Sequence, residues 1–522
     1  MTEYRMLYDS GSKLVKCAIA NDVGQIVAMQ SWEPDVIESE DGFQREWDYR
    51  TYWDNIVALT KTTIESASIS SQDIKYISSS SIRPSCVFAD EENNAVYIGA
   101  SFELRGIDYA DELEDEFSEM TGKSIYESCG HFPSLLLPPA RYKYFQEEID
   151  EDDRITRITQ YLPQDSWMLV KLGGEVHANI VSAGESGFFD LEMKLWHPAW
   201  EHILDLPKYF FPWPVQPGEI IGTVSEHYQE ELGLGADTKL VAGLPDTQAA
   251  LLGAGCVEHG NIGAILGTTT PVQMVSDQLL MSPTEETWSG LMAAKSICDG
   301  YFIEANTGLT GQLLKWAANL FFSHESSELT EQYEQLDDAY KRYDQYEQEA
   351  SSEEIRMDSV YSFLGPSPLA STQMGITPGL FHFQSPGGVQ EITTQRDSFI
   401  TAVFDNIQFA ISRNIDILKE KMPSTEHSIS IMGGVTRNPV ILQRFADLYN
   451  TTVTSSTSFE TTIQGLLVLC DIAAGKLQSI DDLKTRYREQ HLFRKFKPRS
   501  SMTKTITNKY RTWQRLFKQY RD

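Results

Sequence analysis

Two short polar turns, each between apolar segments with strand-like composition, constrain the fold of this chain most. The first turn is DSGS at residues 9–12, between residues 6–8 and 14–20. The second is GTTT at residues 267–270, inside the segment NIGAILGTTTPVQMVS. The shared layout favours two related halves. Any α/β protein has several such turns, however, so the layout alone leaves that choice open.

The segments around the first turn indicate an α/β architecture. The segment GQIVAMQSWE is a third strand candidate, so the chain is predicted to open with a β-meander. Residues 52–66 have helical spacing of apolar side chains, and IKYISSSSI after them is typical of a buried strand. Strands that alternate with helices in this way predict an α/β fold.

The second half of the chain has the same mixture. Residues 323–359 are strongly acidic and helix-forming, which predicts a solvated helical excursion. Residues 360–390 are rich in Pro, Gly and Ser and are predicted to be a loop. A helix is predicted over residues 396–418, and a strand over residues 428–432 that runs into Gly433 and Gly434.

Charge and composition narrow the class of partner. The 522 residues include 43 Lys and Arg against 75 Asp and Glu, a net charge of −32. So acidic a surface repels polyanions, which argues against nucleic acid or an anionic membrane as the main partner. The sequence has neither a signal-peptide pattern nor an apolar run of ~18 residues, so we expect a cytoplasmic protein. The scattered cysteines form no CxxC pair and are expected to be reduced thiols.

The C-terminal tail has the opposite charge. Residues 476–522 hold 14 basic and 4 acidic residues. Tyr510, Trp513, Phe517 and Tyr520 fall at helical spacing within it. This pattern predicts a C-terminal helix that packs on the acidic body rather than an arm that binds nucleic acid.

Four segments have residues suited to phosphate chemistry, and each also has an ordinary structural explanation. The two turns offer backbone N–H groups and hydroxyls to a phosphate, and Asp9 can hold Mg²⁺ through water, but both could be plain hairpin turns. Asp246 precedes the helix candidate TQAALLGAG and is either a helix cap or a general base. Residues 433–438 (GGVTRN) either let a ligand lie against the backbone or make a tight connection.

Taken together and in this order, these segments resemble the FGGY carbohydrate kinase family, with branches such as xylulokinases, glycerol kinases and autoinducer-2 kinases. The resemblance runs from residue 7 to about residue 475, with traces in the tail. It is carried by GLPDTQAALLGAG, TGLTGQLLKWAANLF, GGVTRNPVILQRFADLYN and KPRSSMTKTITNKYRTWQRLF. The resemblance implies an α/β fold of two actin-like (ribonuclease H-like) domains with a ligand cleft between them. These would be residues 1–254 and 255–475, with residues 476–522 as a helical tail that packs back on the body.

The same resemblance implies roles for individual residues. Asp246 would be the general base, and Asp9 and Asp246 would lie at the metal, Mg²⁺. The family's reaction uses ATP to phosphorylate a small polyhydroxy compound, and a homodimer is left open. The implied nucleotide contacts are Ser12, Lys16, Gly267, Thr268, Gly311, Lys315, Gly434 and Asn438.

The acceptor pocket departs from the family pattern. Arg83 fits the position from which glycerol kinases hold a polyol, although it could equally be a structural ion-pair partner, and Pro84 stands where they have glutamate. Lys13 and Leu14 replace small hydroxyl residues in the first turn. The segments SIRPS and GASFELR most resemble autoinducer-2 kinases. The candidate substrate residues are Arg83, Glu103, His131, Phe132 and Asp246.

Two functional hypotheses follow. The first is an active kinase that phosphorylates a hydroxyl of a small sugar, polyol or related compound, with an aspartate base. The alternative is a catalytically weak or inactive homologue that acts as a nucleotide-binding regulatory protein, suggested by the altered first turn. A chaperone-like or actin-like ATPase shares the fold, but the segment GLPDTQAALLGAG argues against it.

Overall fold

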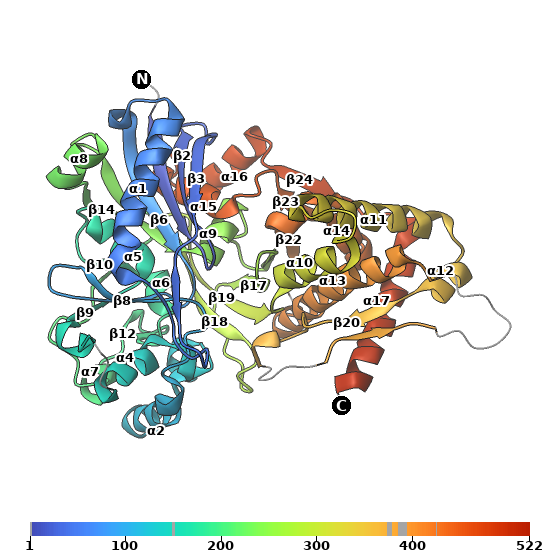
Figure 1. Cartoon of the computed structure of the whole chain (residues 1–522), viewed down its shortest axis with the longest axis horizontal. Coiled ribbons are helices and arrows are strands. Elements are labelled where there is room, and N and C mark those ends of the chain that lie inside the picture. The colour runs from blue at the N-terminus through green and yellow to red at the C-terminus, as the bar shows by residue number, and fades with distance from the viewer. Residues whose placement is uncertain (1–2, 149–151, 373–377, 385–393, 424, 522) are drawn as a thin grey trace. The chain divides into compact units, whose positions relative to one another are not determined.

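The structure is a computed structural model, and it describes residues 3–148, 152–372, 378–384, 394–423 and 425–521. The chain divides into two compact units (Figure 1). Unit 1 comprises Met1–Glu258, Val275–Ile303 and Glu460–Glu489, and unit 2 comprises His259–Met274, Glu304–Phe459 and Gln490–Asp522. Both units are therefore built from separate stretches of sequence. The domain boundaries expected near residues 254 and 475 stay predictions.

Unit 1 is built on a mixed six-stranded sheet. Strand β1 pairs antiparallel with β2 and parallel with β6, which in turn pairs parallel with β15. Strands β3 and β14 pair antiparallel at the two edges. In spatial order the strands are β14 (Ile220–Thr223), β15 (Lys239–Pro245), β6 (Ile74–Ser81), β1 (Tyr4–Ser10), β2 (Val15–Asn21) and β3 (Ile26–Trp32).

A second, antiparallel sheet and several short strands complete the β structure of unit 1. In spatial order this sheet contains β4 (Val36–Glu38), β5 (Arg45–Trp47), β8 (Ala95–Gly99), β7 (Cys86–Ala89) and β9 (Gln160–Leu162). The remaining strands are β10 (His177–Asn179) with β13 (Trp213–Val215), β11 (Phe189–Asp190) with β12 (Leu195–Trp196), β18 (Trp288–Ala294) and β19 (Cys298–Asn306).

The helices of unit 1 surround these sheets. Helix α1 begins after Asp48, whose carboxylate accepts a hydrogen bond from the Arg50 amide as an N-cap does. Its buried face packs with the strands and α5 in one hydrophobic core. The helices are α1 (Tyr49–Ala67), α2 (Ala110–Thr121), α3 (Ile125–Cys129), α4 (Pro138–Glu147), α5 (Gln164–Lys171), α6 (Ile180–Gly184), α7 (Ala199–Ile203), α8 (Glu226–Leu232), α9 (Asp246–Gly253), α15 (Thr461–Ala473) and α16 (Ile480–Glu489).

Unit 2 contains most strands of a seven-stranded sheet, in the order β18-β19-β17-β16-β22-β23-β24, and longer helices. Strand β16 pairs antiparallel with β17 and parallel with β22, and β22 pairs parallel with β23. The strands are β16 (Asn261–Ile265), β17 (Pro271–Ser276), β20 (Tyr361–Phe363), β21 (Leu380–His382), β22 (Ser428–Met432), β23 (Val453–Ser456) and β24 (Phe493–Phe496). The helices are α10 (Thr310–Phe322), α11 (Leu329–Glu349), α12 (Ser352–Asp358), α13 (Arg396–Lys421), α14 (Pro439–Tyr449) and α17 (Ser500–Arg521).

The two units repeat one strand order. The series β2-β1-β6-β15-β14 of unit 1 has the same succession of antiparallel, parallel, parallel and antiparallel pairings as β17-β16-β22-β23-β24 of unit 2. The two predicted polar turns join the equivalent hairpins β1-β2 and β16-β17. The internal repeat that the sequence layout favoured is thus present in the topology.

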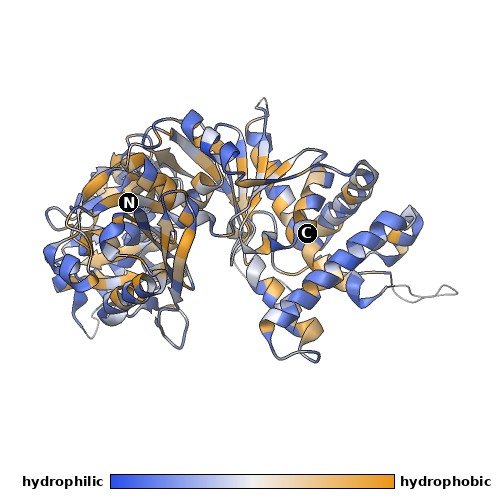
Figure 2. Ribbon diagram, turned by 90° about the horizontal axis from the view of Figure 1, so that it is seen from above, coloured by the Kyte–Doolittle hydropathy of each residue, from blue (hydrophilic) through white to orange (hydrophobic). Residues whose placement is uncertain are grey.

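Hydropathy follows this arrangement. In Figure 2 the strands are mostly hydrophobic in colour, whereas many helices show both colours along their length. This is the expected pattern for buried sheets covered by amphipathic helices. Among the described residues, no helix combines the length and apolar composition needed to cross a membrane.

The predicted meander is confirmed as β1-β2-β3, but two local expectations need correction. Asp9 and Ser10 are the last residues of β1, so the turn begins at Gly11 rather than at Asp9. The acidic stretch at residues 323–359 is helical as predicted, but it is not simply solvated. One face of α11 is buried and includes Leu336, Tyr340 and Tyr343, because apolar side chains at helical spacing pack inward.

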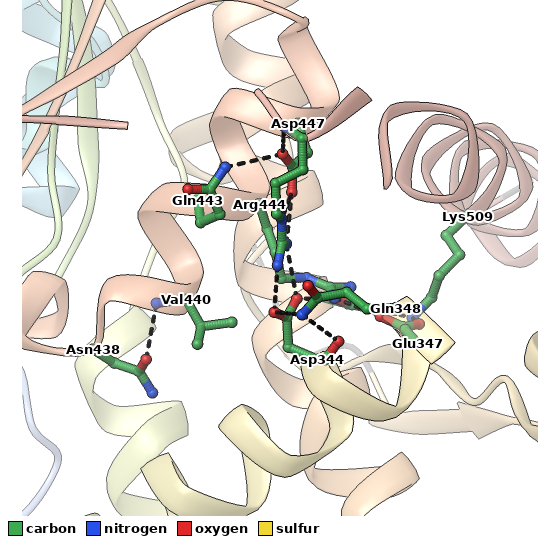
Figure 3. A network of polar contacts seen from close by, with 11 residues as sticks. Asp344, Glu347, Gln348, Asn438, Val440, Gln443, Arg444, Asp447 and Lys509 are labelled. Carbon is green, nitrogen blue, oxygen red and sulfur yellow. Dashed lines mark hydrogen bonds and ion pairs between the residues drawn. The ribbon is translucent and has the colours of Figure 1, made fainter. Parts of the chain in front are cut away.

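Charged side chains also lie inside unit 2, where α11 meets its neighbours. Figure 3 shows Arg444 of α14 beside Asp344 and Glu347 of α11, with Lys509 reaching Glu347 from α17. The Arg444 guanidinium also donates to Asp405 of α13 at 2.8 Å. Buried charges persist when each has hydrogen-bonded partners of opposite sign, and this cluster, which we call the Arg444 cluster, meets that condition.

The remaining expectations concern the second half of the chain. The predicted helix at residues 396–418 is α13, and the predicted strand at residues 428–432 is β22. The predicted loop at residues 360–390 contains the antiparallel pair β20 and β21, and residues 373–377 and 385–390 of it lie outside the described residues. The tail contains α16, β24 and α17, and Tyr510 and Trp513 of α17 pack in a core with Phe409, so the predicted C-terminal packing helix is confirmed.

Candidate active-site groups

The first predicted phosphate turn lies between two residues of opposite charge. Asp9 on β1 and Lys16 on β2 are register partners, and 3.9 Å separates Lys16 Nζ from an Asp9 carboxylate oxygen. Lys16 also donates a 2.6 Å hydrogen bond to Glu460, and Ser80 donates to Asp9 at 3.1 Å. Ser12 lies in the exposed turn between the strands. The turn thus offers the accessible Ser12 hydroxyl, and the strand after it carries a lysine, Lys16, whose partners are carboxylates.

Asp246 is the first residue of α9 and follows directly after β15. Its own side chain accepts a 3.0 Å hydrogen bond from the Thr247 hydroxyl. Helix α9 lies in backbone contact with α15. A Cβ at Gly253 would meet the Thr461 carbonyl, and one at Gly465 would meet the Ala249 carbonyl. Two glycines therefore let α15 hold the helix that carries Asp246 at close range.

Burial changes the acidity of both aspartates. Burial raises the pKa of Asp9 to about 6, opposed by Lys16 and assisted by the charge of Asp246. Burial likewise raises the pKa of Asp246, and Arg83 opposes that rise. A carboxyl whose pKa is raised by the charge of a second carboxyl marks a place where a cation is favourable. A raised pKa also suits a carboxylate that must accept a proton.

This pair is compatible with Mg²⁺. Magnesium is usually bound by one or two carboxylates together with phosphate and water oxygens. Among the described residues, no group of three or more His, Cys, Asp or Glu side chains gathers as a metal site. Asp9 and Asp246 would therefore supply the protein oxygens, and the rest of the coordination would come from phosphate and water.

A second set of charges centres on Glu185, at the end of α6. Arg83 donates to both Glu185 oxygens at 3.4 Å, and His131 Nε2 lies 2.7 Å from Glu185 Oε2. Gln248, two residues after Asp246, donates to Glu185 at 2.8 Å. The His131 ring also donates from Nδ1 to the Cys129 carbonyl at 2.8 Å. We call Arg83, His131, Glu185 and Gln248 the Glu185 cluster.

The ionisation of this cluster follows from its geometry. Burial alone would raise the pKa of Glu185, but Arg83 and His131 lower it to about 2. Burial alone would lower the pKa of His131, but Glu185 and the Cys129 carbonyl raise it to about 10. At neutral pH the cluster therefore holds two cations and one anion, and both Arg83 and Glu185 interact electrostatically with Asp246.

Two other predicted substrate residues, Glu103 and Phe132, lie outside the Glu185 cluster and have structural partners of their own. Glu103 is buried and accepts from Arg105 and from the Arg45 amide, in an ion network that also contains Glu46. Its carboxylate is thus occupied by structural donors, and its role in acceptor binding stays a prediction. Phe132 is half-buried, and its carbonyl accepts a 2.8 Å hydrogen bond from Trp288. The Trp288 ring also packs against the His131 ring, with 5.2 Å between the two ring centroids.

In unit 2, the second predicted phosphate turn touches the start of α10. The Gly311 amide donates to the Thr268 carbonyl at 3.2 Å, and the Thr310 hydroxyl donates to the Gly267 carbonyl at 3.2 Å. A Cβ at Gly311 would lie 2.8 Å from the Gly267 carbonyl oxygen, so only glycine allows this approach. Gly267 and Thr268 are exposed, and Lys315 is an exposed residue one turn further along α10.

The predicted adenosine loop lies between β22 and α14. Gly434 is exposed, and a Cβ built on it would have no atom within 4 Å, so there is open space beside its backbone. Asn438 is the N-cap of α14: its oxygen accepts from the Val440 amide at 3.0 Å, and its amide group donates to Asp337 of α11 at 2.9 Å. Figure 3 shows Asn438 and Val440 in this arrangement. The open backbone at Gly434 fits a nucleotide, whereas the Asn438 side chain already has structural partners.

Sequence reasoning missed several residues of these groups. Glu185 stands alone as an acid in the segment SAGESG, which is a weak local signal for a buried carboxylate. Gln248 lies two residues after Asp246 in the segment GLPDTQAALLGAG, so the sequence could have indicated that it lies near Asp246. Glu460 and Asp337 gave no signal, since their partners Lys16 and Asn438 lie 444 and 101 residues away.

Comparison with known proteins agrees with this organisation. The profile of the FGGY family of carbohydrate kinases, N-terminal domain, matches residues 4–253. The candidate sugar kinase YoaC of Bacillus subtilis (strain 168) is 23% identical over 471 residues, which cover 89% of each chain. An autoinducer-2 kinase of Klebsiella pneumoniae is 25% identical over 331 residues, 62% of this chain and 60% of that relative.

The fold comparison extends over the whole chain. The crystal structure of gluconate kinase from Lactobacillus acidophilus has a TM-score of 0.79 to this protein, with 16% sequence identity, and the match covers 99% of this chain and 98% of that one. At this identity the likeness concerns the fold. The predicted α/β fold with two actin-like domains is confirmed.

Proposed function

Residues 4–253 are the N-terminal domain of a carbohydrate kinase of the FGGY family, and from this premise we propose that the chain uses Mg²⁺-ATP to phosphorylate one hydroxyl of a small polyhydroxy compound. Asp246 is proposed as the general base. The observation that carries this proposal is the position of Asp246, a half-buried carboxyl at the start of α9 with a raised pKa beside the polar Glu185 cluster.

The proposed step is a direct phosphoryl transfer. The acceptor hydroxyl oxygen forms a bond to the γ-phosphorus while the bond from that phosphorus to the β,γ-bridging oxygen breaks, and ADP leaves. Asp246 takes the hydroxyl proton as the new bond forms. Positioning of the two reactants supplies much of the rate enhancement in such reactions. Because Asp246 must accept a proton, the reaction requires a carboxylate at this position, and an amide cannot replace it.

Binding roles are proposed for groups of each unit, taken separately. In unit 1, Ser12 and Lys16 would contact phosphate, and Asp9 with Asp246 would hold Mg²⁺, which neutralises phosphate charge during transfer. In unit 2, Gly267, Thr268 and the backbone at Gly434 would bind the nucleotide. The open space beside Gly434 and the close glycine contact of Gly311 support this assignment.

The experiment that tests the proposal measures ADP release with Mg²⁺-ATP over a panel of ketoses, polyols, aldonates and the autoinducer-2 precursor. We expect at least one compound to give turnover. Asp246→Asn should lower kcat by about 10²- to 10⁴-fold, which is the usual range for loss of a general base. The matched control is Asp237→Asn, an exposed aspartate of the same unit that pairs with Lys75 and should leave kcat unchanged.

Two results would contradict the proposal. Equal turnover by Asp246→Asn and wild type would remove Asp246 as the base. ATP binding without turnover on any panel member would instead favour the nucleotide-binding regulatory protein. Calorimetric titration of ATP into both proteins separates loss of binding from loss of chemistry.

A further inference from the structure

We propose that Asp165 is a positioning residue for the acceptor site, because its carboxylate holds in place the two chain segments that carry Arg83 and Glu185. Asp165 is the second residue of α5 in unit 1, and its side chain is wholly buried. It lies outside the groups that are proposed to contact phosphate, metal or nucleotide. Because Arg83 and Glu185 are assigned to the acceptor under the proposed function, this role of Asp165 rests on that function.

The Asp165 carboxylate receives three side-chain donors from two other segments. The Ser182 hydroxyl donates to its Oδ2 at 2.9 Å, and the Asn179 amide donates to the same oxygen. The Ser81 hydroxyl donates to its Oδ1 at 3.4 Å. Burial raises the pKa of Asp165 to about 6, and the hydrogen bonds from Ser182 and Asn179 oppose that rise, so the group is ionised at neutral pH. An ionised carboxylate only accepts hydrogen bonds, which matches these donors.

One arm of this network leads to Arg83. Ser81 is the last residue of β6, and Arg83 follows two residues later. Ser79 of the same strand provides a second tie, because its hydroxyl donates to the Asp165 backbone carbonyl at 2.7 Å. Both serines are wholly buried. The contacts with α5 therefore fix the end of β6, from which the segment with Arg83 leaves the sheet.

The other arm leads to Glu185. Asn179 is the N-cap of α6, and its side-chain oxygen accepts from the Ser182 amide at 2.8 Å. The Glu185 amide in turn donates to the Ser182 carbonyl at 3.3 Å. Helix α6 has only five residues. So short a helix has little stability of its own, so its position depends on contacts such as those with Asp165.

The two arms meet where Arg83 contacts Glu185. Both hydrogen bonds of this pair are 3.4 Å long, which is longer than is usual for a guanidinium and a carboxylate. A small shift of either segment would therefore separate the two side chains. Misplacement by about 1 Å can lower the rate of an enzyme about 10²-fold. Asp165 thus controls the separation of Arg83 and Glu185 through the segments that carry them.

The test measures Asp165→Ala alone and in an Arg83→Gln background, with the acceptor that gives turnover. Alone, the substitution should lower kcat/KM for the acceptor by about tenfold or more and change the KM for ATP by less than about twofold. In the Arg83→Gln background, the factor of loss should be at least about threefold smaller, because the contact between Arg83 and Glu185 is already absent. A residue that only stabilises the fold would give the same factor in both backgrounds.

Milder variants separate the two arms and keep the test valid if Asp165→Ala fails to fold. Ser81→Ala and Ser182→Ala each remove one hydroxyl and cut one arm, and both losses should shrink in the Arg83→Gln background. Asp165→Asn keeps an oxygen for Ser182 and Asn179 and should restore most of the lost kcat/KM. Equal losses in Asp165→Asn and Asp165→Ala would contradict a tether made of hydrogen bonds.

The matched control is Asp358→Ala in unit 2. Asp358 is also a buried aspartate, and it accepts a 2.9 Å hydrogen bond from the Ser398 hydroxyl. Its replacement removes a comparable contact far along the chain from the acceptor residues. Any loss of kcat/KM that it causes should have the same factor with Arg83 and with Arg83→Gln.

Hydrogen exchange followed by mass spectrometry adds a readout that needs no substrate. In Asp165→Ala, faster exchange should be concentrated in peptides from residues 81–85 and 179–186, while α16 of the same unit should exchange as in the wild type. An increase spread evenly over unit 1 would overturn the positioning role, and so would equal factors in the two Arg83 backgrounds. A wild type without turnover would overturn the proposed function and the acceptor role of Asp165 together, whereas turnover with equal factors would overturn the role of Asp165 alone.

Discussion

The side-chain amide of Asn438 donates a 2.9 Å hydrogen bond to Asp337, 101 residues earlier in the chain. Asn438 caps the helix that follows the proposed adenosine loop, and Asp337 lies on the acidic helix α11. Asp337 therefore fixes which way the Asn438 amide points, and so which group caps the Val440 amide. The acidic helix thereby takes part in shaping the loop.

Replacing Asp337 should affect nucleotide binding more than turnover. We expect Asp337→Ala to raise the KM for ATP about tenfold with a smaller change in kcat, because the buried Asn438 amide loses the nearer of its two acceptors in Asp337, the carboxylate, at a cost of about 1–3 kcal/mol. Asp337→Asn retains an acceptor oxygen and should restore most of the affinity. Steady-state kinetics with varied ATP checks this. Asp338→Ala, an exposed neighbour on α11, is the control, and equal KM values for the two alanine variants would contradict the prediction.

The stability of the fold should depend on pH through His177. Burial lowers the pKa of this imidazole to about 4, and the Glu175 carbonyl accepts a 2.8 Å hydrogen bond from its Nδ1. The folded pKa lies below the unfolded value of about 6.5, so the unfolded chain binds the extra proton. Stability should therefore fall as pH decreases from about 6.5 to about 4, by about 3 kcal/mol from this group.

Urea unfolding at several pH values measures this dependence. His177→Asn should flatten the decrease between pH 6.5 and 4, because the amide does not titrate there and can still donate to the Glu175 carbonyl. His227→Asn changes an exposed histidine of the same unit and should leave the slope unchanged. A wild-type slope that survives in His177→Asn would show that other groups control acid unfolding.

The contact between α9 and α15 should tolerate no added atom. Gly465→Ala places a methyl group against the Ala249 carbonyl, so the two helices must separate. We expect a loss of about 1–3 kcal/mol in unfolding free energy and a lower kcat, since α9 carries Asp246. Thermal melting and ADP release on the same preparation measure both effects. Ala473→Ser, at the half-exposed end of α15, is the control, and a Gly465→Ala protein with wild-type melting would refute the tight contact.

The C-terminal helix should be held by charge as well as by its aromatic core. Lys509 of α17 donates to Glu347 at 2.8 Å and lies 2.6 Å from Asp405, and it is buried in the Arg444 cluster (Figure 3). Lys509→Met leaves excess negative charge in the interior, which typically costs about 3–5 kcal/mol. Denaturant unfolding should show this loss, whereas Lys518→Met on the exposed side of α17 should have no effect. Similar midpoints for the two variants would contradict the role of Lys509.

The local elements around Asp9 and Asp246 were predictable from the sequence. Apolar segments on both sides of a polar turn gave the hairpin β1-β2, and the small-residue run after Asp246 gave α9. The periods that distinguish strands from helices act over a few residues, so they can be read locally. The buried face of α11 was harder to predict, because the many charged residues of this helix obscured the apolar spacing of Leu336, Tyr340 and Tyr343.

The partners of the charged side chains were not predictable in this way. Arg83 was expected either to contact the acceptor or to form an ion pair, and the structure gives it Glu185, which lies 102 residues away. Position 84 holds proline where glycerol kinases have glutamate. The fold nevertheless places a carboxylate beside Arg83, that of Glu185 directly after α6. Glu103 carries the same charge but is occupied by Arg105. Residue type alone could not distinguish these two carboxylates.

The sequence by itself indicated the alternation of strands, turns and helices around the two polar turns, suggested a layout shared by two halves, and placed an aspartate before a helix. Only the tertiary structure decided which carboxylate meets which cation, as Lys16 with Glu460 and Arg83 with Glu185 demonstrate. The physical reason is range. Backbone geometry and hydrophobic periodicity act between near neighbours in the chain, whereas ion pairing and pKa depend on distance and burial in space, which are fixed when the chain folds.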